Sequence, residues 1–298
     1  MLLATPDATR LGPGLVVALD GPASSGKSSV GAAAAKELGY RFCDTGLLYR
    51  AVTWLALDRG VMANDAGALV DLVSEIELVD GGDGRLSRVA VDGVDRTEAV
   101  HGPQVDIAVS AISGIAELRL ALLTRQRHLA SEGRIVMAGR DIGSVVLPDA
   151  DLKLYLDASV AERARRRVLE RGIDPEADEA AAITAELKRR DQLDSSRAIA
   201  PLRVSPDAVV IRTDGNEFED TVRLVVAAIR NAEAAAAITA ASAATPLGAD
   251  AAEAGGGPVA DPAESAKPPR RLRSRRPARA ERRPIRPTPV ATRVVPII

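Results

Sequence analysis

The chain has 298 residues, of which 46% are hydrophobic, and its formal net charge is −2. This composition can supply the core of one large domain or of two ordinary ones. The single cysteine, Cys43, excludes an internal disulfide bond, and we expect a buried structural thiol. The first residues have neither a basic start nor a sustained apolar segment, and no run reaches the length of a membrane span. We therefore expect a cytoplasmic protein without a signal peptide or membrane contact.

The N-terminal part of the chain predicts an arm, a strand and a helix in that order. Residues 1–14 contain two glycines and two prolines without periodicity, which indicates a flexible arm. Residues 15–20 form an apolar run that is typical of a buried parallel strand. From Lys27 onward, Val30, Ala34 and Leu38 recur on one helical face. The strand and the helix therefore flank a short loop rich in glycine and serine.

That loop matches the P-loop pattern G-x-x-x-x-G-K-[ST] through Gly21, Gly26, Lys27 and Ser28. Its backbone amides and the N-terminus of the helix are expected to bind a polyphosphate, Lys27 to add a full charge, and the Ser28 hydroxyl to ligate Mg²⁺. The pattern by itself leaves kinase, GTPase and ATPase motor open. The predicted nucleotide-binding residues are Gly21, Pro22, Ala23, Ser24, Ser25, Gly26, Lys27, Ser28 and Ser29.

The middle of the chain predicts a mixed insert over about residues 45–133, after a second short strand at 40–44. Helical patterns at 47–57 and 66–74 precede two alternating stretches, 75–79 and 88–94, which read as short strands around a glycine-rich turn. A single helical run follows over 105–130. This change of pattern indicates a small α+β unit inserted between strands of the main sheet.

Parallel-strand patterns resume at 134–138, 152–156 and 208–212, and a helix is expected at 219–231. Alternating strands and helices predict a three-layer α/β/α fold with a five-stranded parallel sheet. Ligands in such sheets bind beyond the carboxyl ends of the strands. Residues expected at those ends are Asp20, Gly21, Asp44, Thr45, Arg140, Asp141 and Asp157.

Arginines dominate the segment after the 152–156 strand. Phosphoryl transfer between two nucleotides brings two polyanions together, and forked guanidinium donors suit phosphate oxygens. An alternative is a solvated helix face with ion pairs to Glu162 and Glu170. A Ras-type GTPase is not favoured, because the base-reading Asn-Lys-x-Asp motif does not occur. The arginines are Arg163, Arg165, Arg166, Arg167, Arg171, Arg189, Arg190 and Arg197.

Four blocks resemble bacterial cytidylate kinase, in that family's order, across about residues 15–231: DGPASSGKSSV, FCDTGLLYRAV, AGRDIGSVVLPDADLKLYLDASVAERARRR and RDQLDSSRAIAPL. The resemblance implies transfer of the ATP γ-phosphoryl group to CMP or dCMP with Mg²⁺ present. It also implies a kinase domain at 15–234, a monophosphate-binding insert at about 45–133, an arginine-rich lid at about 159–204 and a monomer. Ser24, Ser25 and Ser29 depart from the commoner family residues.

The resemblance also carries site residues over by position. It implies that Arg50, Arg140 and Arg197 hold the acceptor phosphate, with Thr45 nearby. The residues implied for the cytosine base are Ser110, Arg119 and Asp141, and those implied for the ribose are Arg190 and Asp194. The catalytic set is then Lys27, Arg140, Arg163 and Arg197. Asp141 and Asp44 have an alternative reading as helix N-caps.

The C-terminal part, residues 235–298, is rich in alanine and proline and then in arginine, which predicts a disordered tail. Residues 267–293 include 11 basic side chains and one acidic side chain. A solubilising linker is the expected role, and a weak contact with nucleic acid is the alternative. Two other functions stay open at this point: a related kinase that accepts UMP, and a nucleotide-gated protein that binds nucleic acid through this tail.

Overall fold

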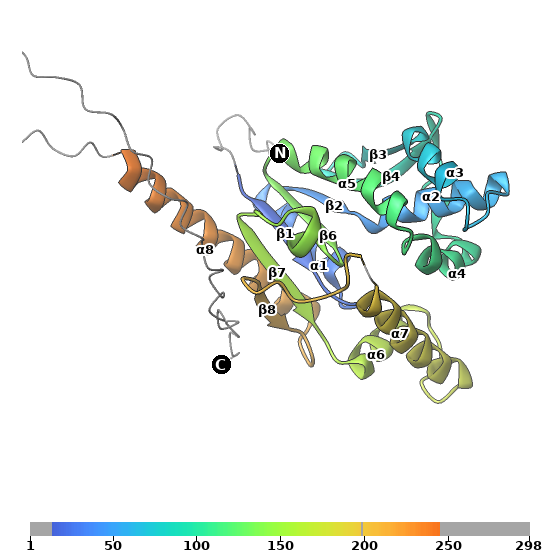
Figure 1. Cartoon of the computed structure of the whole chain (residues 1–298). Coiled ribbons are helices and arrows are strands. Elements are labelled where there is room, and N and C mark those ends of the chain that lie inside the picture. The colour runs from blue at the N-terminus through green and yellow to red at the C-terminus, as the bar shows by residue number, and fades with distance from the viewer. Residues whose placement is uncertain (1–13, 198, 245–298) are drawn as a thin grey trace, which may run out of the picture.

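The computed structural model describes residues 14–197 and 199–244, in which a twisted sheet is covered by helices on both faces (Figure 1). Five parallel strands lie side by side in the order β2, β6, β1, β7 and β8. Neighbouring parallel strands cannot be joined by a tight turn, so crossover connections link them. The bounds are β1 (Val16–Asp20), β2 (Arg41–Asp44), β6 (Ile135–Gly139), β7 (Leu152–Asp157) and β8 (Val209–Arg212).

The sheet is wider than the sequence predicted: eight strands belong to it within the described residues, so the expected number of five is wrong. The insert supplies the difference. Its strand β4 (Arg85–Val91) pairs in parallel with β2 through Phe42–Arg85 and Cys43–Leu86. β3 (Ile76–Asp80) and β5 (Val94–Asp95) pair with β4 in antiparallel fashion. The insert therefore continues the sheet of the main body.

Two apolar clusters lie on opposite faces of the sheet and make the fold three-layered. On one face, Val17 and Leu19 of β1 pack with side chains of α1 (Lys27–Leu38) and α8 (Phe218–Ala244). On the other face, Ala18 and Met137 pack with side chains of α2 (Gly46–Arg59) and α5 (Ala116–Ser131). Cys43 belongs to this second cluster and is fully buried, as expected. Aliphatic side chains thus hold the sheet between two helical layers.

The helical run expected at 105–130 is two helices, α4 (Pro103–Ile112) and α5, which meet at an angle of 100°. The break lies between Ser113 and Ile115, and Ile115 has extended backbone angles. The prediction of a single helix over 105–130 is therefore wrong. The break directs the start of α5 toward the carboxyl ends of the strands. The other short elements of the insert are α3 (Ala66–Asp71), η2 (Leu72–Glu75) and η3 (Ala99–His101).

Two helices, α6 (Val160–Glu170) and α7 (Asp178–Ser196), form a separate lobe beside the P-loop (Figure 1). The Ser159 hydroxyl caps α6 by accepting a hydrogen bond from the amide of Glu162 at 3.2 Å. Ala164, Ile183 and Leu187 of the lobe pack against Ala23 of the P-loop. The lobe and the loop therefore share a small apolar core.

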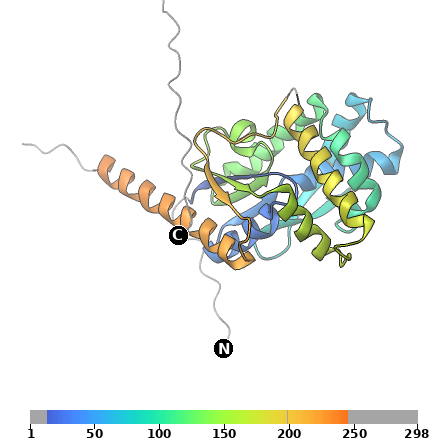
Figure 2. The same ribbon diagram turned by 90° about the horizontal axis from the view of Figure 1, so that it is seen from below.

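Helix α8 is longer than the helix expected at 219–231, and it continues past the predicted domain end at 234 to Ala244. Its first part packs on the sheet, whereas its last part extends beyond the body, with Ile238 71% exposed (Figure 2). By length and composition, Phe218–Ser242 meets the criterion for a membrane span, contrary to the expectation of no such run. Residues 1–13 of the expected arm and residues 245–298 of the expected tail lie outside the described residues.

Candidate active site

A cavity of about 370 Å³ opens at the carboxyl ends of β2 and β6, beside the loop that follows β1. The P-loop forms one side, α2, α4 and α5 of the insert form another, and α6 and α7 form the third. Most of the predicted site residues line this cavity. They are Ala23, Ser24, Gly26, Lys27, Ser28, Ser29, Thr45, Arg50, Arg119, Arg140, Asp141, Arg190, Asp194 and Arg197.

The shape of the P-loop depends on its two glycines. A Cβ on Gly21 would lie 2.5 Å from the carbonyl oxygen of Leu156, so only glycine fits there. Gly26 is the N-cap of α1 and has a φ of 85°, in the left-handed region that favours glycine. As a glycine, Gly26 has no side chain that could cap the N-terminus of α1. The first amides of α1 are therefore free to bind an anion.

Lys27 and Ser28 begin α1 and carry the polar chemistry of the loop. The Lys27 ammonium is buried and donates a hydrogen bond to the carbonyl oxygen of Pro22 at 3.0 Å. Burial, and after it the nearby Arg140 guanidinium, holds the pKa of Lys27 well below its usual value. A bound polyphosphate would raise the pKa of Lys27 again, because its negative charge favours the ammonium form.

The Ser28 hydroxyl donates a 2.5 Å hydrogen bond to Oδ2 of Asp44, at the end of β2. The other oxygen, Oδ1, accepts from the amide of Gly46 at 2.9 Å. A hydroxyl and a carboxylate side by side suit Mg²⁺, which takes oxygen ligands and needs only one or two from the protein when phosphates supply others. From the sequence, Asp44 was expected at a strand end, with helix N-capping as its alternative role. The sequence did not predict its hydrogen bond with Ser28.

Two arginines expected to hold the acceptor phosphate share one buried carboxylate. Arg140 Nε donates to Asp194 Oδ2 at 2.9 Å, and Arg197 Nη2 donates to Asp194 Oδ1 at 2.5 Å. Arg197 Nη2 also lies 3.1 Å from the Ser113 hydroxyl oxygen, to which it donates. Arg50, on α2, donates to Asp106 Oδ1 at 2.5 Å. Each of these guanidinium groups thus has a carboxylate partner, of which Asp194 lines the cavity.

Arg119 and Asp141 form a second buried pair, with a distance of 2.6 Å between Nη2 and Oδ2. Arg119 also donates to the backbone oxygen of Ser113 at 3.0 Å, and its guanidinium lies 5.3 Å from the centre of the Tyr49 ring. Asp141 occupies the N-cap position of the π-helical turn η4 (Ile142–Val146), yet its side chain accepts no capping hydrogen bond there. The alternative reading of Asp141 as an N-cap is therefore wrong.

Arg190, on α7, also lines the cavity. Its Nε is buried and has no hydrogen-bond partner within the part of the chain that the structure describes. Burial, and after it the Arg140 guanidinium, lowers the pKa of Arg190 from its ordinary value. A buried guanidinium nitrogen without a partner is unfavourable, so this site is prepared for an anion or another acceptor.

Five predicted residues do not line the cavity: Gly21, Pro22, Ser25, Ser110 and Arg163. Ser110 lies on α4 away from it, while Ser113, in the break between α4 and α5, lines it. Arg163 is buried in the lobe, where it donates to Ala158 O at 3.0 Å, to Ala23 O at 2.9 Å and to Asp191 Oδ2 at 2.5 Å. In this structure Arg163 holds the P-loop against α6. Gly21, Pro22 and Ser25 shape the loop from behind the cavity wall.

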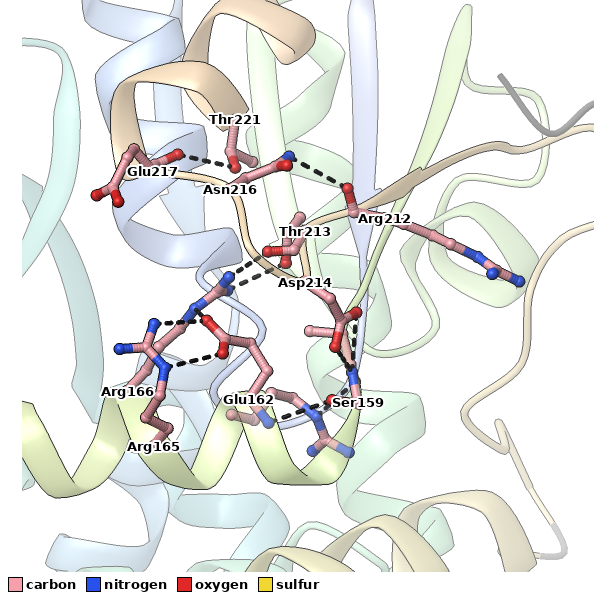
Figure 3. Close-up of polar contacts among 12 residues, drawn as sticks. Ser159, Glu162, Arg165, Arg166, Arg212, Thr213, Asp214, Asn216, Glu217 and Thr221 are labelled. Atoms are coloured by element: carbon pink, nitrogen blue, oxygen red, sulfur yellow. Dashed lines mark hydrogen bonds and ion pairs between the residues drawn. The ribbon is translucent and has the colours of Figure 1, made fainter. Parts of the chain in front are cut away.

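Arg166 and Arg167 line the cavity from α6 instead. Figure 3 shows Arg166 reaching the loop after β8, where Nη1 donates to Oγ1 of Thr213 at 3.0 Å. Its Nε donates to Oε1 of Glu162 at 2.8 Å, and Arg165 pairs with the same carboxylate. The alternative of a helix face with ion pairs to Glu162 and Glu170 is therefore partly realised on α6.

The family model and the curated relatives indicate one family. A family model described as cytidylate kinase matches residues 17–231. A cytidylate kinase from Rhodococcus opacus is 44% identical over 209 residues, which cover 70% of this chain and 91% of that protein. One from Symbiobacterium thermophilum is 43% identical over 214 residues, covering 71% and 94%. A gluconokinase structure from Sinorhizobium meliloti is 17% identical, covers 75% of this chain and 96% of that chain, and has a TM-score of 0.39.

Proposed function

Because the chain belongs to the cytidylate kinase family, we propose that it transfers the γ-phosphoryl group of ATP to CMP and dCMP, giving ADP with CDP or dCDP. The observation that carries the proposal is the position of the Arg119–Asp141 pair. The pair lies at the wall of the cavity that the P-loop also lines. The arginines expected to hold the acceptor phosphate line the same cavity. One cavity thus has groups for a triphosphate, for a monophosphate and for a polar base.

On the donor side, residues 21–29 hold the ATP phosphates through backbone amides, with Lys27 beside the transferred group. Ser28 and Asp44 would hold Mg²⁺, which would supply positive charge to the phosphates. Lys27 now donates to Pro22 O and exchanges this partner for a phosphate oxygen when ATP binds. The amides and the ammonium are already in the loop, so little reorganisation is needed.

On the acceptor side, Arg50, Arg140 and Arg197 hold the CMP phosphate, with the Thr45 hydroxyl near them. Each arginine has several donors, so it can bind a phosphate oxygen and still contact its aspartate. Arg190 and Asp194 hold the ribose. The aspartates keep the arginines extended in the cavity before the phosphate arrives.

For the base, Asp141 accepts from the exocyclic amine of cytosine, and Arg119 donates to the ring acceptors. Uracil has a carbonyl in place of that amine, which would face the Asp141 carboxylate and repel it. Ser110 and the neighbouring Ser113 belong to the same end of the insert, and Ser113 is the one at the cavity wall. The pair therefore provides discrimination between the two pyrimidines.

The transfer itself needs no strong protein base. The attacking atom is an oxygen of the CMP phosphate, which is largely dianionic at neutral pH. Alignment of the two phosphates and compensation of their charge by Lys27, Arg140 and Arg197 lower the barrier. Arg163 contributes by holding Ala23 of the P-loop in position.

The proposal extends to the domains. Residues 45–133 act as the monophosphate-binding insert, and residues 159–204 act as a lid over ATP that excludes water as an acceptor. The kinase domain spans 15–234, and we propose a monomer in the cytoplasm. The apolar helix α8 packs on the sheet through Val225, Val226 and Ile229, which is consistent with a helix of the core.

An acceptor panel tests the proposed function. ADP release is measured with ATP and each of CMP, dCMP, UMP, AMP and GMP, for the wild type and for Asp141→Ala. We expect CMP and dCMP to be the best acceptors. In Asp141→Ala, the CMP concentration for half-maximal rate should rise by about 10-fold to 100-fold, while that for ATP stays nearly constant. Faster turnover of UMP by the wild type would reject the cytosine assignment.

A further inference from the structure

Asp20 is a buried carboxylate at the end of β1 that takes no part in the contacts described above. Its residue is 3% exposed, and it does not line the cavity. Oδ1 accepts a hydrogen bond from the amide of Ile142 at 2.8 Å, and Oδ2 accepts one from the amide of Gly143, also at 2.8 Å. Both oxygens therefore bind one short segment that is more than a hundred residues away in sequence.

That segment is the start of the π-helical turn η4, which directly follows Arg140 and Asp141. Inside the turn, the amides of Val145 and Val146 donate to the carbonyl oxygen of Asp141. The first amides of a helical turn have no partner within it. Asp20 supplies that partner for Ile142 and Gly143, and so fixes the direction in which the chain leaves Asp141.

On its own strand, Asp20 is followed at once by Gly21, the first glycine of the P-loop. Gly21 lies against the backbone of Leu156, so the loop has little freedom to shift at this point. A single side chain thus joins the strand that leads into the donor loop to the turn that follows the acceptor-binding pair Arg140 and Asp141. In-line transfer requires these two parts to be aligned closely, because small displacements of reacting groups reduce the rate strongly.

We propose that Asp20 is a positioning residue that aligns the P-loop with the acceptor-binding segment at Arg140 and Asp141, through its two hydrogen bonds to η4. This inference rests on the proposed function for its kinetic consequence, but the hydrogen bonds are independent of it. Loss of one of them changes the relative position of two ligands that are each still bound. The turnover number should then fall more than either KM rises.

The ionisation of Asp20 gives this role a measurable pH dependence. Burial raises the pKa of Asp20 to about 6 and the nearby Asp141 adds to the rise, against the amides of Gly143 and Ile142 and the charge of Lys27. The phenol of Tyr155 on β7 is also close enough to be affected by Asp20. When Asp20 is protonated, one of its two oxygens becomes a hydroxyl that no longer serves as the acceptor for a backbone amide. One of the two hydrogen bonds is therefore lost below this pH.

The test compares Asp20→Asn with the wild type in full-length protein with saturating ATP and CMP. The asparagine amide also presents a donor to one of the two backbone amides, so it resembles the protonated carboxyl. At pH 8 we expect the turnover number of Asp20→Asn to be lower by about 10-fold to 100-fold, with both KM values within about 3-fold. The ratio of wild type to variant should fall toward one as the pH is lowered through about 6. Ionisation of the CMP phosphate cancels in this ratio.

Asp151→Asn is the matched control, because Asp151 accepts a hydrogen bond from the amide of Val16 at the other end of the same strand. Its ratio to wild type should stay near one at every pH. A ratio for Asp20→Asn that is near one, or that is constant from pH 5 to 8, would overturn the proposal. The same pH-dependent ratio in Asp151→Asn would also overturn it.

A second measurement needs neither the variant nor the substrates. Ile142–Gly143 is the one Ile–Gly dipeptide in the sequence, so carbonyl-¹³C isoleucine with ¹⁵N-glycine selects the Gly143 amide alone in an NMR spectrum. We expect this peak to move as Asp20 is protonated around pH 6 in the wild type. A peak that stays fixed from pH 5 to 8 overturns the hydrogen-bond role. A failed function would instead appear as a wild type that turns over no acceptor in the panel.

Discussion

The proposed donor and acceptor sides of the cavity are built in different ways. The proposed donor side is nine consecutive residues, 21–29, whose shape follows from two glycines and one helix N-terminus. The acceptor side draws single side chains from α2, α5, α7 and the end of β6, and carboxylates hold its arginines in place. A site made of backbone is complete once the loop has folded, whereas a site made of dispersed side chains depends on the whole tertiary structure.

Removing the one full charge of the donor loop should produce the largest effect. For Lys27→Ala we expect turnover to fall by about 1,000-fold, because a preorganised charge beside the transferred group is lost. The melting temperature should stay close to that of the wild type, since the Lys27 ammonium has one hydrogen-bond partner among the described residues, Pro22 O. Lys36→Ala, at the exposed end of the same helix, is the control and should keep full activity. ADP release and thermal unfolding measure both, and a variant that keeps a tenth of the wild-type rate would contradict the assignment.

Two aspartates on α7 sharpen the comparison, because each serves one side of the cavity. Asp194 holds Arg140 and Arg197, and Asp191 holds Arg163, which donates to Ala23 of the P-loop. We expect Asp194→Asn to raise the KM for CMP by about 10-fold and to leave the KM for ATP nearly unchanged. Asp191→Asn should raise the KM for ATP by about 10-fold and leave the KM for CMP nearly unchanged.

Initial rates over a grid of ATP and CMP concentrations separate the two KM values. The variants differ by three positions on one helix and remove the same charge, so each is the other's control. Equal changes of both KM values in both variants would mean that α7 acts on the cavity as a whole, and the division into two sides would be wrong at this helix.

The smallest expected effect is on stability, at the point where the two sides meet. Because burial raises the pKa of Asp20 to about 6, above its ordinary value of 3.8, the folded protein binds this proton more tightly than the unfolded chain does. As the pH falls from 7 toward 4, the wild type should therefore gain free energy of unfolding relative to Asp20→Asn, by no more than about 3 kcal/mol.

Urea unfolding of both proteins at several pH values measures this difference. Other titrating groups are common to both proteins, so their contributions largely cancel in it. A difference that stays constant from pH 7 to 4, or that changes in favour of Asp20→Asn, would show that burial does not destabilise the ionised form of Asp20.

The sequence predicted the backbone shape of the P-loop, because a contiguous motif specifies backbone geometry. Gly21 and Gly26 lie where the pattern requires, and α1 begins at Lys27. The five core strands could also be recognised from their apolar runs. The width of the sheet could not, because β4 joins β2 through only two residue pairs, Phe42–Arg85 and Cys43–Leu86, which have no pattern of their own.

The residues proposed for the acceptor side stay a prediction, and the sequence did not predict their contacts. The break at Ser113 places that residue at the cavity and Ser110 outside it, and a continuous helical pattern concealed the break. Arg163 looked like its neighbours on α6, yet it faces the P-loop backbone while Arg166 and Arg167 face the cavity. Asp44, at the end of β2, pairs with Ser28 in the first turn of α1. Such pairings depend on side-chain direction, which spacing alone does not give.

The burial of Cys43 has a practical consequence for watching this protein move. It is the sole thiol of the chain, it is fully buried, and burial raises its pKa to about 12, so it should be inert toward maleimides. The natural sequence is therefore already a background for site-specific labelling. Cysteines introduced at exposed positions on α7 and on α3 would accept a pair of fluorophores, and energy transfer between them would report on motion of the lobe against the insert in single molecules.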